Sequence, residues 1–189
     1  MVSSVAVYCG SSHGTHPEYT TAARAMGTAL ARSGLTLVYG GGNVGLMGEV
    51  ADACLDAGGE VHGVIPKQLV DKEMAHPRVT LHVVDTMAQR KTKMEELADA
   101  FVAMPGGMGT MEELTEVLTM QQLGHISAPV ALLDVRGFWN PWCEMMDTMV
   151  SRGFLNGKYA NAMIISEEPE DLLKQFSTWV NPGDKWAEV

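Results

Sequence analysis

The sequence predicts a single doubly wound α/β domain with a central, mostly parallel sheet of about seven strands. Short apolar runs of strand length alternate with stretches of helical periodicity along the whole 189-residue chain. Apolar strands that alternate with helices are typical of a parallel sheet covered by helices on both faces. No linker, repeat or low-complexity segment divides the chain, so residues 1–189 are expected to form one domain with a sizeable core.

The individual elements follow from apolar periodicity and from the placement of proline and glycine. Pro17 lies near the start of a helix, and Gly34, Gly58 and Gly124 follow the ends of three helices. The segment 66–77 is the least regular and is expected to cover the functional site of this Rossmann-like arrangement. Strands are expected at 5–9, 35–39, 60–65, 79–84, 100–104, 129–134 and 162–165, and helices at 17–32, 45–57, 87–98, 110–123, 141–152 and 169–179.

The composition limits the classes of ligand. Charged residues make up 19% and hydrophobic residues 46%, and the net charge of −10 argues against binding to nucleic acid or to an anionic membrane. No basic segment precedes the first apolar run, and no apolar stretch approaches the roughly 18–20 residues that span a bilayer. Cys9, Cys54 and Cys143 are widely spaced, as expected of reduced thiols in a cytoplasmic protein, and no metal-ligand spacing occurs.

Two glycine-rich turns carry most of the functional information. The first is GGGNVGLMG at 40–48 and the second is PGGMGTMEE at 105–113, and each follows an apolar strand and opens a helix. Glycines let the backbone approach a ligand, and unpaired amides at a helix N-terminus bind anions. Ligands of an open parallel sheet lie at the carboxyl ends of its strands. Both turns should therefore share one cleft with the segments 9–12 and 66–67 and with the turn before Arg90.

The first turn admits three interpretations. Gly40-x-Gly42-x-x-Gly45 matches the dinucleotide-binding fingerprint, which also expects an acidic residue at the end of the next strand. That strand ends here in a Pro-Lys pair, and Glu60 lies at its other end. The turn could instead only pack a helix on a strand, or it could cradle a phosphate, which is the favoured interpretation. Neither turn is followed by Lys-Ser or Lys-Thr, so a P-loop is excluded.

The second turn ends in Glu113, and the presence of this carboxylate can be explained in two ways. Thr110 can cap the helix, with Glu113 three residues further on, which fits a capping box. However, a carboxylate in the first turn of a helix that binds phosphate is repelled by that ligand. Its presence there therefore suggests acid/base chemistry beside a phosphorylated ligand.

Two basic residues lie early in the helix expected at 87–98. The positive charges of Arg90 and Lys91 interact unfavourably with the helix dipole at this position unless an anion is nearby. The alternative is a solvated basic face, in which Lys93 pairs with Glu95 or Glu96.

The second turn also carries a family resemblance. Pro105-Gly-Gly-Met-Gly-Thr-Met-Glu-Glu113 resembles the Pro-Gly-Gly-x-Gly-Thr-x-x-Glu signature of the Lonely Guy (LOG) proteins, the cytokinin riboside 5′-monophosphate phosphoribohydrolases. Arg90-Lys91 falls where the family has its Arg-Lys pair, whereas Ala88 replaces the usual histidine, which bears on substrate preference. The likeness covers nearly the whole chain, including YCGSS at 8–12, the turn at 40–48, GVIP at 63–66 and the segment 87–94.

The resemblance implies catalytic roles for Arg90 and Glu113. The glycine turns would hold a 5′-phosphate through their amides, together with Thr110 and one or both of Arg90 and Lys91. The residues expected to contact the substrate are Glu73, Arg90, Lys91, Gly106, Gly107, Met108, Gly109, Thr110, Met111 and Glu112, with Gln121 further along the helix face of Glu113, and Gly41, Gly42, Gly45 and Ser11 at the other two strand ends.

The implied activity is hydrolysis of the N-glycosidic bond of an adenosine 5′-monophosphate, plain or N6-modified. The products would be adenine or a cytokinin and ribose 5-phosphate, and no cofactor or metal would be needed. Cleavage would pass through an oxocarbenium-like state that a carboxylate, expected to be Glu113, stabilises. A homodimer is expected from the resemblance to short LOG proteins and from Met- and Trp-rich segments, with Met145, Met146 and Met149 in one helix and Trp139 and Trp142 flanking Pro141.

Two alternatives belong to other classes. Related folds with this turn carry nucleotides or pterin cofactors without cleaving them, as molybdenum cofactor carriers do, but the presence of both Arg90 and Glu113 favours an enzyme. Similar proteins have also been labelled lysine decarboxylases. A pyridoxal phosphate enzyme needs a Schiff-base lysine, whereas Lys91 and Lys93 lie on a charged helix and the chain is short for such a scaffold.

Overall fold

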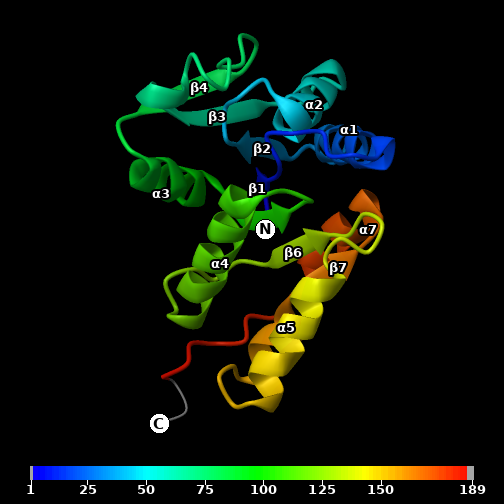
Figure 1. Cartoon of the computed structure of the whole chain (residues 1–189), viewed down its shortest axis with the longest axis vertical. Coiled ribbons are helices and arrows are strands. Elements are labelled where there is room, and N and C mark those ends of the chain that lie inside the picture. The colour runs from blue at the N-terminus through cyan, green and yellow to red at the C-terminus, as the bar shows by residue number, and fades with distance from the viewer. Residues whose placement is uncertain (1, 187–189) are drawn as a thin grey trace.

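The computed structural model describes residues 2–186 as one sheet with helices on both faces (Figure 1). Its strands are β1 (Ser4–Tyr8), β2 (Thr36–Tyr39), β3 (Val61–Pro66), β4 (Thr80–Val84), β5 (Ala100–Ala103), β6 (Val130–Leu133) and β7 (Ile164–Ser166). They are arranged in the order β4-β3-β2-β1-β5-β6-β7, and every neighbouring pair is parallel. The expected doubly wound architecture is confirmed, and the sheet is parallel throughout.

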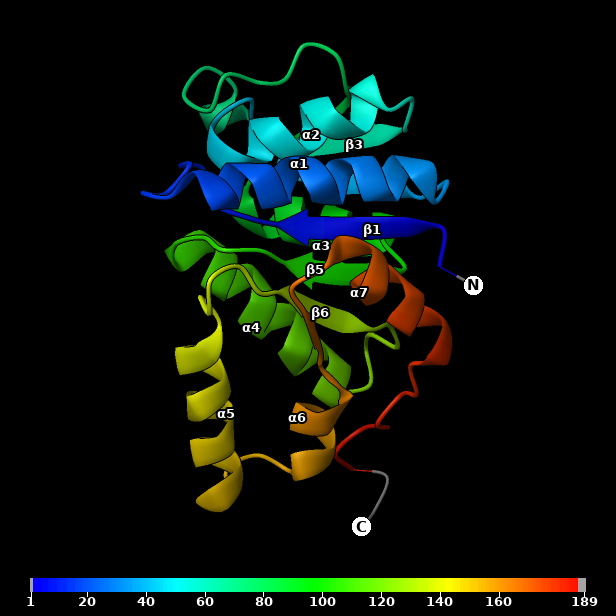
Figure 2. The same ribbon diagram turned by 90° about the vertical axis from the view of Figure 1, so that its right-hand side faces the viewer.

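The helices form two layers, one on each face of the sheet (Figures 1 and 2). They are α1 (Pro17–Arg32), α2 (Gly45–Asp56), α3 (Met87–Leu97), α4 (Met108–Gln122), α5 (Asn140–Ser151), α6 (Gly157–Ala162) and α7 (Pro169–Gln175). Val5 and Val7 of β1 pack in the core under α1, α2 and α7, whereas Ala6 and Tyr8 pack in the core under α3 and α4. The two cores alternate along β1 because successive side chains of a strand point to opposite faces.

Most predicted element boundaries agree with the structure to within two residues. Gly34, Gly58 and Gly124 follow the ends of α1, α2 and α4 with φ values of 68°, 82° and 76°, the left-handed conformation that commonly ends a helix. The short helix α6 and the 3₁₀ turn Lys67–Leu69 were not predicted. Both are short, and short elements carry little periodicity.

Two further features concern the predicted subunit interface and the expected absence of a membrane span. Trp139, expected at a subunit interface, is only 1% exposed and lies in the core, where its backbone N–H donates to Asp134 Oδ1 at 3.0 Å. The expectation was wrong because Trp139 immediately precedes α5 and packs inward. Within residues 2–186, no helix combines the length and apolar character needed to cross a bilayer.

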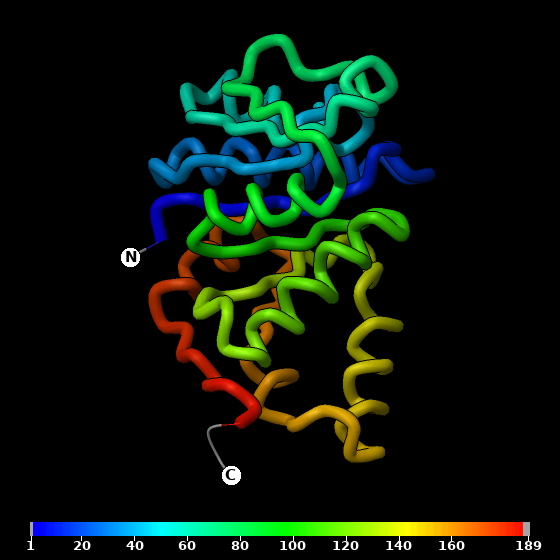
Figure 3. Tube along the Cα trace, turned by 90° about the vertical axis from the view of Figure 1, so that its left-hand side faces the viewer, coloured from blue at the N-terminus to red at the C-terminus, as the bar shows by residue number. Residues whose placement is uncertain are grey.

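The order of the strands places the functional site. The chain runs from β1 outward to β4 and then returns to β5, which pairs with the other side of β1. This reversal opens a crevice at the carboxyl ends of β1 and β5, where doubly wound proteins bind ligands. In the view of Figure 3, α3 and α4 lie one after the other along the face beside this crevice.

Candidate active site

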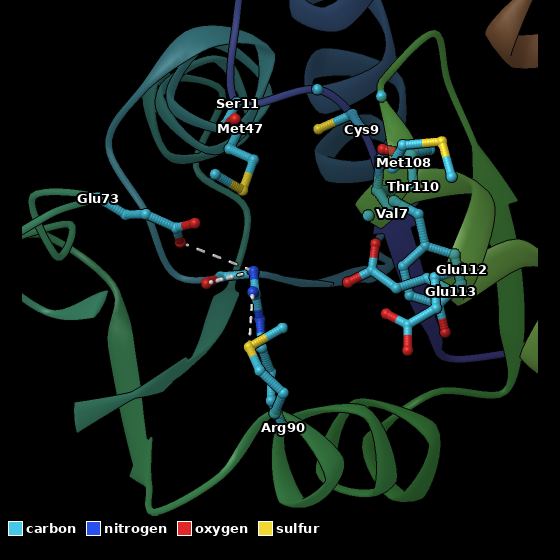
Figure 4. A pocket seen from close by; sticks show the side chains of 16 residues that line it. Val7, Cys9, Ser11, Met47, Glu73, Arg90, Met108, Thr110, Glu112 and Glu113 are labelled. Atoms are coloured by element: carbon cyan, nitrogen blue, oxygen red, sulfur yellow. Dashed lines mark hydrogen bonds and ion pairs between the residues drawn. The ribbon is translucent and has the colours of Figure 1, made fainter. Parts of the chain in front are cut away.

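A cavity of about 200 Å³ opens at the carboxyl ends of β1, β2 and β5 (Figure 4). Four of the five features that were expected to converge contribute to it, and the exception is the Pro-Lys pair after β3, whose Lys67 pairs with Asp85 at 2.6 Å. Glu73 of the covering segment also lines the cavity. The full lining consists of Val7, Tyr8, Cys9, Gly10, Ser11, Gly40, Met47, Glu73, Met87, Arg90, Gly107, Met108, Gly109, Thr110, Glu112 and Glu113.

The N-terminus of α4 forms one wall of the cavity. The helix begins at Met108 after the N-cap residue Gly107, which has no side chain to accept a hydrogen bond from the first turn. A Cβ added at Gly107 or Gly109 would meet nothing within 4 Å, so a ligand has room to approach this backbone. Open amides at a helix N-terminus favour an anion. This wall is therefore suited to a phosphate.

The helix start corrects one sequence-based interpretation. Thr110 lies in the first turn rather than at the cap position, and it is 4% exposed and lines the cavity. A capping box between Thr110 and Glu113 is therefore absent from α4. The sequence suggested it because threonine and glutamate have the required spacing, but the preceding glycines let the helix start two residues earlier. Helix capping therefore does not explain why a glutamate stands at position 113.

Arg90 forms the opposite wall and comes from α3. Its side chain is 6% exposed, and Nη2 donates to the backbone carbonyl of Gly40 at 3.1 Å. Nη1 lies 3.9 Å from Met87 Sδ, and Nε has no hydrogen-bond partner among the described residues. A guanidinium has five N–H donors, so most of the hydrogen-bonding capacity of Arg90 remains available to a ligand.

Glu73 is held over Arg90 by the segment between β3 and β4. The backbone N–H of Asn43 donates to the Glu73 carbonyl at 2.9 Å, and Ala75 forms an antiparallel bridge with Gly42. Glu73 Oε2 is buried, lies 3.9 Å from Arg90 Nη2 and accepts no hydrogen bond within the described residues. Buried polar atoms normally have partners, so this oxygen and Arg90 Nε mark places where a polar ligand can bind.

Glu113 lies across the cavity from Arg90 (Figure 4). Burial raises the pKa of its carboxyl from 4.5 to about 7, with further increases from Glu112 and Glu73. Arg90 and Lys91 act in the opposite direction, because their positive charges favour the ionised form. A carboxyl whose pKa is shifted this far in a cleft is a strong candidate for a chemical role.

The end of β1 supplies the floor of the cavity with Tyr8 and Cys9. Burial raises the pKa of both groups above its ordinary value, and the charge of Glu113 raises it further. Both side chains are therefore neutral at pH 7. Cys9 belongs to the segment 9–12 that was expected at the cleft, whereas Tyr8 was not expected there, although it stands at the carboxyl end of the same central strand.

The first glycine turn contributes mainly through packing. An added Cβ at Gly41 would lie 3.2 Å from the Val64 backbone, and one at Gly45 would overlap the Ser11 and Ser12 backbone. Of this turn, Gly40 and Met47 line the cavity, whereas the predicted substrate residues Gly41, Gly42 and Gly45 do not. A side chain at Gly40 would collide with the Arg90 guanidinium. The turn thus brings α2, β3 and Arg90 together.

Four other predicted substrate residues also lie outside the cavity lining, namely Gly106, Met111, Lys91 and Gln121. Gly106 packs closely against Thr110, where an added Cβ would collide with the threonine side chain. The Gln121 side chain is buried and donates to the Ala128 carbonyl at 2.8 Å, which is a structural role. Met111 packs against the core under α4. Lys91 lies 2.7 Å from Glu112 Oε1 and 2.8 Å from Glu116 Oε2, so it connects α3 to α4 instead of lying in solvent. Lys93, by contrast, pairs with Glu96 as one alternative expected.

The fold and the cavity together define a Rossmann-like α/β protein in which an open helix N-terminus and a carboxylate of the same helix face an arginine across one cavity. Cytokinin riboside 5′-monophosphate phosphoribohydrolase LOG of Oryza sativa subsp. japonica is 42% identical over 177 residues, covering 93% of this chain and 73% of the relative. The enzyme of that name from Rhodococcoides fascians is 45% identical over 172 residues, covering 90% and 87%. The chain belongs to the LOG family.

A family model described as "Possible lysine decarboxylase" matches residues 47–176. The cavity does not fit that description, because none of the lysines in the described part of the chain lines it. Without a lysine, no Schiff base with pyridoxal phosphate can form there.

Solved structures share the fold at low sequence identity. The molybdenum cofactor carrier protein of Chlamydomonas reinhardtii aligns with a TM-score of 0.69 at 21% identity, covering 93% of this chain and 98% of the other. The molybdenum cofactor binding protein of Rippkaea orientalis aligns with a TM-score of 0.67 at 21% identity, covering 93% and 95%. Similarity at this level establishes the architecture and leaves the function to the site.

Proposed function

We propose that this protein hydrolyses the N-glycosidic bond of purine nucleoside 5′-monophosphates, with adenosine 5′-monophosphates, plain or N6-modified, as substrates. The observation that carries the proposal is that Arg90 and Glu113 face one cavity whose wall is the open N-terminus of α4. The names of the relatives that are at least 40% identical support the same reaction. The products would be the free base and ribose 5-phosphate.

Each wall has a separate task in this reaction. The amides of Gly107 and Gly109, with Thr110, bind the 5′-phosphate, and this remote binding orients the sugar. Arg90 bridges the phosphate and the departing base with its free donors. Glu73 accepts hydrogen bonds from the nucleotide through the buried oxygen that lacks a partner.

Glu113 acts at the reacting carbon. As the bond between C1′ and the base nitrogen breaks, its electron pair leaves with the base and positive charge develops on the sugar. The ionised carboxylate stabilises that charge and holds the ribose hydroxyls or the attacking water. Water forms the new C1′–O bond and loses a proton, and the base gains one. No cofactor or metal takes part in the proposed reaction.

Product analysis tests the proposal. The protein is incubated with AMP, with isopentenyladenosine monophosphate and with adenosine, and the free bases are separated by chromatography. We expect base release from both monophosphates and at least about 100-fold slower release from adenosine, because adenosine lacks the group that the α4 N-terminus binds. Tight AMP binding without base release would identify a nucleotide carrier instead. Comparable turnover of AMP and adenosine would contradict the assigned phosphate site.

We further propose that the active form is a homodimer. Met145 on α5 is 55% exposed and Phe154 in the turn after it is 87% exposed, and large apolar side chains in solvent often mark an interface. Figure 2 shows α5 and α6 at the end of the molecule opposite α2. Light scattering at micromolar concentration should give twice the mass of 20.4 kDa, and a monomer would refute the dimer.

The three free cysteines suit a reducing compartment such as the cytoplasm.

A further inference from the structure

Lys91 is adjacent to the catalytic arginine and yet belongs to a different set of contacts. Its side chain is 15% exposed, and its Nζ lies 2.7 Å from Glu112 Oε1 and 2.8 Å from Glu116 Oε2. Both carboxylates belong to α4, so this one ammonium group connects the helix that carries Arg90 to the helix that carries Glu113. In the family resemblance, by contrast, Lys91 contacts the nucleotide.

The surroundings of Lys91 are strongly acidic. Glu112 and Glu116 raise its pKa through hydrogen bonding and charge. Glu95, one turn further along α3, has a raised pKa from burial and from Glu116, and Lys91 opposes that increase. Glu116 Oε2 is buried and lies 2.8 Å from the ammonium group of Lys91. Without Lys91, these carboxylates would repel one another across the gap between the helices.

We infer that Lys91 is a positioning residue that clamps α3 to α4 and so holds Arg90 and Glu113 across the cavity, rather than a ligand of the substrate phosphate. The inference rests on the proposed function for its kinetic consequences. Two of the three ammonium donors already face carboxylates, and the side chain does not line the cavity. The substrate phosphate is then bound by the α4 N-terminus and by Arg90.

The clamp also acts on Glu113 through charge. The titratable and charged groups that interact electrostatically with the Glu113 carboxyl are Arg90 and Lys91 from α3, Glu112 from α4, Glu73 from the covering segment, and Tyr8 and Cys9 from β1. Removing the Lys91 charge takes away one of the two positive groups that favour ionised Glu113. The pKa of Glu113 should then rise, and activity that needs the carboxylate should appear only at higher pH.

The decisive variant is Lys91→Met, with Lys93→Met as the matched control. Lys93 lies two residues further along α3, is more exposed and pairs with Glu96 at 3.2 Å, and neither of these two residues lines the cavity. For Lys91→Met we expect kcat with AMP to fall about tenfold or more, because the two helices lose their alignment. The low-pH limb of kcat/KM should move up by at least about half a pH unit. The affinity for ribose 5-phosphate, measured by calorimetry at pH 8, should stay within about twofold, and Lys93→Met should behave as wild type.

A second substitution distinguishes a positioning role of Lys91 from a role as a phosphate ligand. Adding Glu116→Gln to Lys91→Met removes a carboxylate that has lost its partner, so part of kcat should return. A phosphate ligand would give the opposite pattern: weaker binding of ribose 5-phosphate by about tenfold or more, an unchanged pH limb and no rescue. That pattern, or wild-type behaviour of Lys91→Met in every measurement, would overturn the inference. If Lys91→Met does not fold, Lys91→Gln removes the charge and keeps a donor, and the same outcomes apply.

One readout does not depend on turnover. The pKa of Glu113 can be followed by NMR of its side-chain carboxyl carbon in wild type, Lys91→Met and Lys93→Met. An increase in Lys91→Met alone supports the clamp even if no nucleotide is cleaved, and an unchanged value refutes its electrostatic part. Failure of wild type to release base from AMP would instead refute the proposed function, so the two failures are distinguishable.

Discussion

Replacement of Glu113 by glutamine should make the protein more stable at pH 8 while it removes most of the activity. Burial raises the pKa of this carboxyl from 4.5 to about 7, and one pKa unit corresponds to about 1.4 kcal/mol. The folded state therefore holds the proton more tightly than the unfolded state does. Stability is lost as pH rises from 4.5 to about 7, and the loss reaches about 3 kcal/mol above that range. Glu113→Gln cannot ionise and avoids this loss.

The measurement is urea unfolding of wild type and Glu113→Gln at pH 4 and pH 8. We expect the variant to be about 1–3 kcal/mol more stable at pH 8, since the new amide still needs hydrogen bonds, and about equal to wild type at pH 4. Equal stability at both values would show that the carboxyl is not destabilised by burial. A variant less stable at pH 8 would mean that ionised Glu113 stabilises the fold, which would refute the reasoning.

The same variant tests the chemistry. Loss of the charge opposite the oxocarbenium-like state should cost roughly 2–4 kcal/mol, which lowers kcat about 30- to 1000-fold. AMP affinity by calorimetry should be retained or increase, because a negative charge near the phosphate is gone. Wild-type kcat/KM should rise with pH through about 7, since the ionised carboxylate is the active form, and this limb should be absent in Glu113→Gln. The second ionisation of AMP, near pH 6, should persist in both and serves as an internal control. Near-normal turnover by the folded variant would exclude Glu113 as the catalytic carboxylate.

Three other substitutions test the remaining walls. Arg90→Ala should weaken AMP binding about 10- to 100-fold by calorimetry and lower kcat as well, and unchanged affinity would exclude contact with the phosphate. Gly109→Ala should leave the unfolding free energy within about 1 kcal/mol, since its Cβ meets no protein atom within 4 Å, yet it should raise the KM for AMP. Gly157→Ala at the start of α6 is the matched control, with neither property altered. Gly40→Ala should cost about 1–3 kcal/mol of stability and lower kcat/KM about 100-fold, because its Cβ displaces the Arg90 guanidinium; wild-type kcat/KM would refute that placement.

The fold could be predicted from the sequence because its elements are long or flanked by clear signals. Each central strand is a continuous apolar run, and Gly34, Gly58 and Gly124 end their helices in the left-handed conformation as expected. The start of α4 could not be located from Thr110, because threonine is favoured at the cap and is also tolerated within the first turn. The predicted location of Trp139 at an interface was wrong for a related reason, because the apolar character of a side chain does not distinguish a core position from an interface position.

The predicted site residues come together in the structure where motifs lie at strand ends, and they lie apart from the cavity where a contact depends on tertiary geometry. Arg90, Glu73 and the α4 turn line one cavity, as topology and resemblance implied. By contrast, Gly41 and Gly45 are glycines because β3 and the Ser11 backbone approach them closely, which a motif cannot reveal. A glycine-rich turn has the same sequence signature whether the close neighbour is a ligand or the protein itself.

Arg90 and Lys91 show most clearly what sequence cannot supply. They are adjacent, equally basic and expected together at the substrate, yet successive helical residues point about 100° apart. Arg90 therefore reaches the carbonyl of Gly40 at the cavity wall, while Lys91 reaches the carboxylates of Glu112 and Glu116. One residue is available to the substrate, and the other is occupied by the protein. Which basic residue of the pair lines the cavity is thus decided by the neighbouring helix and strand rather than by the motif.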